Sequence, residues 1–215
     1  MLGTGLVGCT LATALVQKGH HVLIGSRSID NPNAISWAAD NGQTAFNGTF
    51  SDAAEFGDLI FNCTSGVYSL DIIRKCGIGK FANKTLIDVG NPADFSQGLP
   101  PVLTICNTSS LGEEIQRLLP ETWVVKALNT VTVEAMANPS LINNGDIDLL
   151  LCGDYNFAKT AVTRLFINDF GWKPENIQDL GGIIHSRAME TMVFFFSALA
   201  IQSGRWLNAI KIYRA

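Results

Sequence analysis

Three glycines near the start of the chain, at positions 3, 5 and 8, have the spacing of a turn that holds the pyrophosphate of a dinucleotide. In the segment GTGLVG, Gly3 permits a tight turn, Gly5 leaves room for the pyrophosphate, and Gly8 lets a helix pack against a strand. A helical pattern over residues 6–18 follows at once, so backbone N–H groups at its start would face the phosphates. We therefore predict a dinucleotide site at this turn.

The end of the second strand indicates which dinucleotide binds. An NAD site usually has Asp or Glu about 20 residues beyond the glycines, where it binds the ribose 2′-hydroxyl. This chain has Gly25-Ser26-Arg27-Ser28 there and no acid. Ser26 can donate a hydrogen bond to a 2′-phosphate, and Arg27 can add a charge-assisted contact. We predict NADP(H) rather than NAD(H); the alternative is that Arg27 is an ordinary solvated surface residue.

Apolar strands alternate with helical patterns along the chain. We expect strands over residues 20–27, 44–46, 58–66, 84–92, 123–131, 146–154 and 176–180. We expect helices over residues 6–18, 34–41, 51–58, 67–76, 109–120, 133–137, 156–170 and most of 185–213, with a possible break at Gly204. This alternation predicts an α/β fold, a doubly wound parallel sheet of the Rossmann type with a short C-terminal helical extension. Residues 1–180 would form the NADP-binding domain, and residues 181–215 a helical segment of the same compact unit.

Only Met1 and Leu2 precede the glycine turn, although about five strand residues usually do. We expect Met1 to be an internal strand residue, with a few upstream residues absent from the printed sequence; an intact mass of 23.2 kDa would contradict this. If the chain does begin at Met1, we expect a poorly held site, because the strand would be too short to pair.

The composition of the chain argues against some classes of binding partner. The net charge is −4, and the absence of a long basic run argues against nucleic acid or a membrane surface as partner. The five cysteines are scattered without a CxxC pair, which favours reduced thiols in a cytoplasmic protein, and we expect no metal site. The most apolar run, residues 192–201, is about half the length of a membrane span, so we expect a buried helix there.

The strand ends that should face the cofactor carry small and amide residues. Residues 64–66 read Thr-Ser-Gly, residues 90–92 read Gly-Asn-Pro, and residues 126–130 read Lys-Ala-Leu-Asn-Thr. Such residues let planar rings approach and offer hydrogen bonds, but no obvious acid–base pair is among them. We expect Lys126 to place its head group at the edge of the sheet, and Arg187 to pair with Glu190 three residues along a helix. We name no catalytic side chain, and we expect His185 to be structural.

Five segments resemble one family in the same order over nearly the whole chain: GTGLVG at 3–8, GSR at 25–27, DLIFNCTSG at 58–66, VVKALNT at 124–130 and SRAMET at 186–191. The chain resembles the NADPH:coenzyme F-420 oxidoreductases and their relatives, which include the cytosolic domain of the STEAP-type metalloreductases. Leu128 stands where the family usually has Phe, and Met189 where it has Leu. Both are apolar exchanges, so they say little about the substrate.

The resemblance implies NADPH binding with hydride transfer to a deazaflavin or flavin, either coenzyme F-420, FMN or FAD. It also implies positions for the cofactor. Thr4, Gly5, Leu6 and Val7 would face the pyrophosphate, Ser26 and Arg27 the 2′-phosphate, Thr64, Ser65 and Gly66 the nicotinamide ribose, and Ala127 the carboxamide with Asn129 nearby. We add Asn91, at the neighbouring strand end, to these cofactor-binding residues.

Two other functions stay open. A non-enzymatic NADP(H) sensor would keep the same cofactor site, and a small carbonyl or imine reductase would need a proton donor such as Lys, His or Tyr near the nicotinamide. About 30 residues follow His185, too few for the large substrate domain of hydroxy-acid reductases, so we expect an open cleft for the acceptor. The apolar segment 185–213 needs cover, which predicts a homodimer; a monomer mass at every concentration in light scattering would exclude it.

Overall fold

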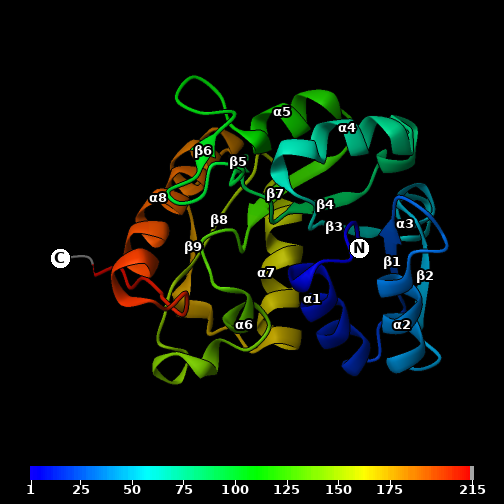
Figure 1. Cartoon of the computed structure of the whole chain (residues 1–215), viewed down its shortest axis with the longest axis horizontal. Coiled ribbons are helices and arrows are strands. Elements are labelled where there is room, and N and C mark those ends of the chain that lie inside the picture. The colour runs from blue at the N-terminus through cyan, green and yellow to red at the C-terminus, as the bar shows by residue number, and fades with distance from the viewer. Residues whose placement is uncertain (214–215) are drawn as a thin grey trace.

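A computed structural model describes residues 1–213, and its strands and helices alternate along the chain (Figure 1). The strands are β1 (Val22–Ser26), β2 (Ala45–Thr49), β3 (Leu59–Asn62), β4 (Thr85–Asp88), β5 (Ala93–Asp94), β6 (Val102–Leu103), β7 (Trp123–Ala127), β8 (Leu149–Cys152) and β9 (Ile177–Asp179). The α-helices are α1 (Leu6–Gln17), α2 (Pro32–Asp40), α3 (Phe50–Phe56), α4 (Gly66–Cys76), α5 (Leu111–Leu118), α6 (Val133–Met136), α7 (Asn156–Phe170) and α8 (Ser186–Ser203). Short 3₁₀ turns lie at Ile78–Phe81, Pro139–Leu141, Asn143–Gly145, Pro174–Asn176 and Ile183–His185.

The main strands form a parallel-dominated sheet with helices on both faces. Strands β2 and β1 pair in parallel on one side, and the order β3-β4-β7-β8-β9 continues on the other. Only the β7–β8 pair among these is antiparallel. One core, beneath α1, α2, α6 and α7, includes Leu11, Trp37 and Phe166, and the other, beneath α3, α4, α5 and α8, includes Ile73, Ile115 and Met189. The predicted doubly wound α/β fold with a C-terminal helix is confirmed.

Met1 and Leu2 join the two parts of the sheet. Leu2 is fully buried and pairs in parallel with Gly25 of β1 on one side and Asn62 of β3 on the other. Its N–H donates to the carbonyl of Phe61, and its carbonyl accepts from the N–H of Cys63, both at 2.8 Å. The expectation that two residues are too few to pair is therefore wrong, because each of them bonds to a neighbouring strand.

The C-terminal segment is helical over a shorter range than the sequence predicts. Helix α8 ends at Ser203 and is capped by Gly204, whose φ of 68° is left-handed, and residues 205–213 are not helical. Asp148 accounts for this: its N–H donates to the carbonyl of Ile210 and its carboxylate accepts from the N–H of Ile212, so these backbone groups bond to the β8 region instead of to a helix. The part of the predicted segment at residues 214–215 lies outside the described residues.

Helix α8 is only partly covered. Met189, Val193 and Phe196 are buried against the body of the protein, whereas Phe195 is 53% exposed and Ile201 55% exposed. The predicted homodimer through this segment stays a prediction. Among residues 1–213, no helix is long and apolar enough to cross a membrane, and Cys9, Cys63, Cys76, Cys106 and Cys152 are all free thiols.

A hollow of about 450 Å³ lies at the amino ends of β1 and β3, next to the amine of Met1. That amine donates to the carbonyl of Leu23 at 2.9 Å. Burial lowers its pKa from 8.0 to about 6, although the nearby Cys63 opposes this.

Candidate functional site

The glycine turn has the geometry that each glycine position requires. Gly3 has a φ of +116°, and a Cβ there would lie 2.7 Å from the carbonyl oxygen of Cys63. A Cβ at Gly8 would lie 2.2 Å from the carbonyl oxygen of Gly3, so any side chain would separate α1 from the turn. A Cβ at Gly5 would meet nothing within 4 Å, and no side chain caps the start of α1. The space above Gly5 and the uncapped N–H groups of α1 are thus open to an anionic group.

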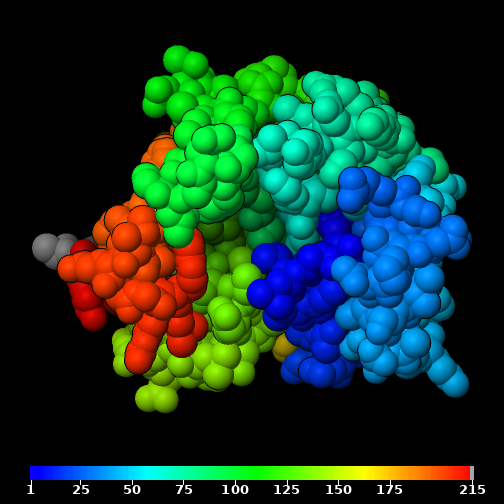
Figure 2. All heavy atoms as spheres, in the orientation of Figure 1, coloured from blue at the N-terminus to red at the C-terminus, as the bar shows by residue number. Residues whose placement is uncertain are grey.

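Three adjoining hollows run from this turn along the carboxyl ends of the strands. The first, of about 530 Å³, extends from Arg27 to Thr64; the second, of about 390 Å³, shares Thr64 with it; and the third, of about 350 Å³, shares Asn91 with the second. We call the first two the cofactor groove and the third the distal hollow. Figure 2 shows the surface hollowed between the blue N-terminal part and the orange-red α8.

Most of the predicted cofactor residues line these hollows. Gly3, Thr4, Gly5, Ser26, Arg27, Thr64 and Ser65 line the first, Val7, Thr64, Ser65, Gly66 and Asn91 the second, and Leu6, Asn91 and Asn129 the distal hollow. Gly8 lines none of them and acts instead through its packing against Gly3. Ala127 is fully buried in the core and lines none of them either, and its contact with a carboxamide stays a prediction.

The residues of the GSR segment lie differently from one another. Arg27 is exposed at the mouth of the first hollow. Ser26 is only 2% exposed, and its hydroxyl donates to the carbonyl of Ser28 at 2.5 Å, so its single proton is already used within the turn. Lys75 of α4 lines the same hollow and supplies a second cation that the sequence did not indicate. The positive charge at this end therefore comes from Arg27 and Lys75.

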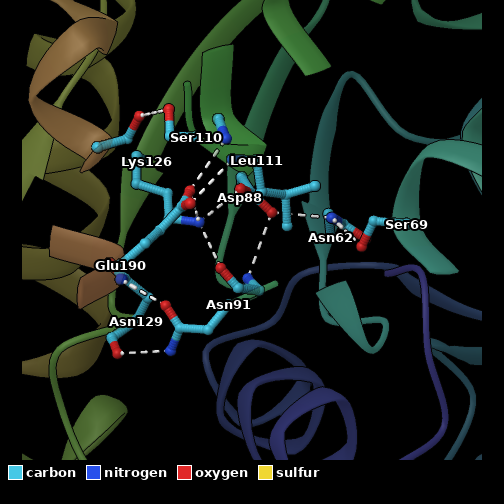
Figure 3. Close-up of polar contacts among 12 residues, drawn as sticks. Asn62, Ser69, Asp88, Asn91, Ser110, Leu111, Lys126, Asn129 and Glu190 are labelled. Atoms are coloured by element: carbon cyan, nitrogen blue, oxygen red, sulfur yellow. Dashed lines mark hydrogen bonds and ion pairs between the residues drawn. The ribbon is translucent and has the colours of Figure 1, made fainter. Parts of the chain in front are cut away.

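The strand ends at Gly66, Asn91 and Asn129 form one bracket. A Cβ at Gly66 would lie 2.0 Å from the carbonyl oxygen of Asn91, so only glycine allows these backbones to meet. Asn91 donates its amide to the carbonyl of Asn129 at 3.2 Å, and Asn129 donates its amide to the side-chain oxygen of Asn91 at 2.9 Å (Figure 3). A second donation, from Asn129 to the carbonyl of Met189 at 3.1 Å, ties the bracket to α8.

A buried charged cluster lies behind this bracket. Lys126 is fully buried, and its ammonium contacts Asp88 at 2.7 Å and Glu190 at 2.9 Å (Figure 3). It also donates to the carbonyl of Gly90, so all three of its protons have partners. Burial acts to lower the pKa of Lys126, but the two carboxylates outweigh it and raise the pKa above its usual value. Lys126 is therefore charged and has no proton free for a substrate.

Glu190 also caps helix α5. Its carboxylate accepts from the N–H of Leu111 at 2.8 Å and from that of Gly112 at 3.0 Å, where the positive end of the helix dipole favours an anion. Two expectations are therefore wrong. Lys126 does not reach the edge of the sheet, and Glu190 does not pair with Arg187, which binds Glu113 at 2.6 Å instead.

A chain of hydrogen bonds connects the cluster to the floor of the cofactor groove. Asn62 donates to Asp88 at 2.8 Å and to the hydroxyl of Ser69 at 3.1 Å. The hydroxyl of Thr64, which lines the groove, donates to the side-chain oxygen of Asn62 at 2.7 Å. The buried cluster thus fixes the rotamer of a side chain that faces the cofactor groove.

Sequence reasoning missed Asp88 and Glu190 as partners, although a signal was present. Lys126 and Asp88 are each the one charged residue of a strand that is covered on both faces, and buried charges are almost always paired. These strands are neighbours, so a Lys–Asp pair could have been predicted. Glu190 could not, because nothing local to α8 indicates that it reaches α5.

Few titratable side chains line the second hollow and the distal hollow, which we call the two inner hollows. Among the described residues that line the second and distal hollows, Glu134 and Cys63 are the titratable ones, and no Lys, His or Tyr is present. Burial raises the pKa of Cys63 to about 12, so its thiol is a weak acid. Within residues 1–213 no group of three or more His, Cys, Asp or Glu could hold a metal ion.

The fold and the glycine-lined groove define a dinucleotide-binding oxidoreductase of the Rossmann class. Residues 1–92 match the family described as NADP oxidoreductase, coenzyme F-420-dependent. The crystal structure of a proposed F-420-dependent NADP reductase from Arthrobacter sp. FB24 is 35% identical, with a TM-score of 0.91, over 99% of this chain and 97% of that one. The chain belongs to this family of NADP-dependent oxidoreductases.

Two further proteins are similar to this chain. The metalloreductase STEAP3 of Rattus norvegicus is 28% identical over 195 residues, which are 89% of this chain but only 35% of that protein, so the chain spans about a third of this relative. A reductive aminase from Aspergillus terreus in complex with NADPH covers 94% of the chain and 61% of its own length with a TM-score of 0.64. At 13% identity that likeness concerns the fold alone.

We expect Lys126→Met to cost about 3–5 kcal/mol of unfolding free energy, because it leaves Asp88 and Glu190 buried without a cation. Lys173→Met, at an exposed lysine, is the matched control and should change stability by less than about 0.5 kcal/mol. Urea denaturation monitored by tryptophan fluorescence measures both. A cost for Lys126→Met as small as that of the control would show that the cluster does not hold the fold.

Proposed function

We propose that this protein transfers a hydride between NADP(H) in the cofactor groove and a flavin or deazaflavin in the distal hollow, with coenzyme F-420, FMN and FAD as members of that class. The observation that carries the proposal is the continuity of the three hollows along the strand ends, with two amide residues at the junction. Hydride transfer between two planar rings requires position above all, and the cofactors carry the chemistry.

The protein's own residues would bind and orient. Arg27 and Lys75 would hold the 2′-phosphate, and the uncapped N–H groups at the start of α1 would hold the pyrophosphate above Gly5. The bracket of Asn91 and Asn129 would set the plane of the nicotinamide, since each amide is fixed by the other. Bound NADPH supplies the hydride.

The side chains around the inner hollows support this proposal over a carbonyl or imine reductase. Such a reductase needs a positioned proton donor, and none of the described lining residues there is Lys, His or Tyr. Reduction of a flavin-like ring needs no such group, because the ring nitrogen that becomes protonated can exchange with solvent. The distal hollow supports an enzyme over a sensor, since a sensor requires the cofactor groove only.

Anaerobic oxidation of NADPH, followed by absorbance at 340 nm, tests the proposal. Riboflavin, FMN, FAD and coenzyme F-420 are offered in turn, and reduction of at least one acceptor, stoichiometric with NADPH, is the expected result. Tight NADPH binding in calorimetry without turnover of any acceptor would contradict hydride transfer and favour the sensor.

Arg27→Ala should weaken NADPH binding by about 1–3 kcal/mol, as for a lost charge-assisted hydrogen bond, and leave NADH binding nearly unchanged. The matched control is Arg164→Ala, an exposed arginine on α7 outside the hollows described above, which should change neither affinity. Isothermal titration with both dinucleotides measures the effect. Equal losses for NADPH and NADH, or equal affinities in the unmodified protein, would refute the role of Arg27.

A further inference from the structure

The distal hollow is apolar except at one side. Its lining consists of Leu6, Asn91, Asn129, Thr130, Val131, Thr132, Val133, Glu134, Val193, Phe196 and Trp206. The aliphatic and aromatic members come from α1, the loop before α6, α6, α8 and the segment after α8, and they suit the faces of a planar ring. Asn91 follows β4 and the other polar members follow β7, so hydrogen-bonding groups gather at the side next to the Asn91–Asn129 bracket.

Charge is distributed unevenly along the three hollows. The first contains Arg27, Lys75 and Asp71, whose carboxylate pairs with Arg74 at 2.9 Å; the second has no charged lining residue, and Glu134 is the single charged residue among those described around the distal hollow. A phosphate or carboxylate is held in proteins by cations or by several free N–H donors. The distal hollow offers no cation, and Glu134 would repel such a group.

Two buried polar atoms of residues that line the distal hollow have no hydrogen-bond partner. Asn129 is 9% exposed, and its side-chain oxygen has no hydrogen-bond partner. Its amide nitrogen already donates twice, to Asn91 and to the carbonyl of Met189, which fixes the orientation of the side chain. The hydroxyl of Thr130, 2% exposed, is also without a partner. A buried carbonyl left unpaired is costly, so a ligand that presents an N–H donor at this side would be favoured.

Given the hydride transfer proposed above, we infer that the acceptor is an uncharged planar heteroaromatic ring with an N–H edge, an isoalloxazine without phosphate or carboxylate groups. Riboflavin is the probe of this class. The reaction balances as NADPH + H⁺ + riboflavin giving NADP⁺ and dihydroriboflavin: the hydride carries both electrons from the nicotinamide to the flavin ring, and the proton comes from solvent. FMN, FAD and coenzyme F-420 carry anionic groups that this hollow does not compensate.

The test compares kcat/KM for riboflavin, FMN, FAD and coenzyme F-420 under anaerobic conditions at saturating NADPH. We expect riboflavin to exceed each anionic acceptor by about tenfold or more at low salt. A value for any of the three that equals or exceeds that of riboflavin would overturn the inference while leaving the hydride transfer intact. No turnover with any acceptor would instead overturn the proposed function, and this inference with it.

Substitutions of Glu134 provide the second part of the test. Glu134→Gln should lower the riboflavin-to-FMN ratio of kcat/KM about threefold, and Glu134→Lys about tenfold, because repulsion of the phosphate is removed and then reversed. Added salt should shrink both effects. The matched control, Glu175→Gln, changes an exposed acid outside the three hollows and should leave the ratio unchanged. A ratio that does not respond to either Glu134 variant would contradict the electrostatic basis of the selectivity.

Discussion

The fold is organised around a fully buried cation, Lys126. A fully buried ammonium costs several kcal/mol in lost hydration, which is recovered only when every proton has a partner at good geometry. Lys126 meets that condition with Asp88, Glu190 and the carbonyl of Gly90. The second carboxylate would leave a surplus negative charge, but the N-terminus of α5 stabilises it. Two strands and two helices are thereby held by a single set of contacts that cannot be changed one residue at a time.

This arrangement explains how a groove without secondary structure of its own can be rigid. The residues that face the cofactor groove lie just beyond the strand ends, where the ladder hydrogen bonds have stopped. Thr64 is held by Asn62, which is held by Asp88, and Gly90 is held by Lys126. The loop ends are therefore fixed from below by the same charges that join β4, β7 and α8. On the other side of the groove, Gly3 is fixed because its N–H donates to the carbonyl of Gly25 at 3.0 Å, while the preceding Leu2 bonds to the β3 segment.

The periodicity of apolar residues along the chain predicted the structural features that depend on local sequence. The helix expected over residues 156–170 has those bounds in the structure, because its apolar spacing and its closing Gly171 are both local signals. Helix α3 begins one residue earlier than expected because Thr49 forms a capping box with Asp52. Likewise, the glycine spacing placed the turn and the GSR segment at one hollow, since a strand–helix–strand unit determines that geometry by itself.

What the sequence could not predict depends on partners that are distant along the chain. Arg187 and Glu190 have the spacing of a helical ion pair, yet each faces a different part of α5, because tertiary contacts with Glu113 and with the helix N-terminus are stronger than a solvated pair. Residues 205–213 have a composition suited to a helix, but Asp148 bonds their backbone. Lys75 of α4 lines the first hollow of the cofactor groove, although it is far in sequence from the glycine turn.

The placement of charge connects this architecture to the proposed reaction. Lys126 lies behind the bracket of Asn91 and Asn129, and its ammonium is fully paired. A positive charge therefore lies close to the strand ends, but it is not available to a substrate. A hydride donor and acceptor need a dry, close-packed surface, and a free cation there would attract water and competing anions. Because Asp88 and Glu190 neutralise the charge of Lys126 inside the protein, the junction of the cofactor groove and the distal hollow can be formed by a pair of amides and no ionised group. The same cluster that stabilises the fold thus leaves the junction neutral, which is the condition under which two stacked rings exchange a hydride without a catalytic side chain.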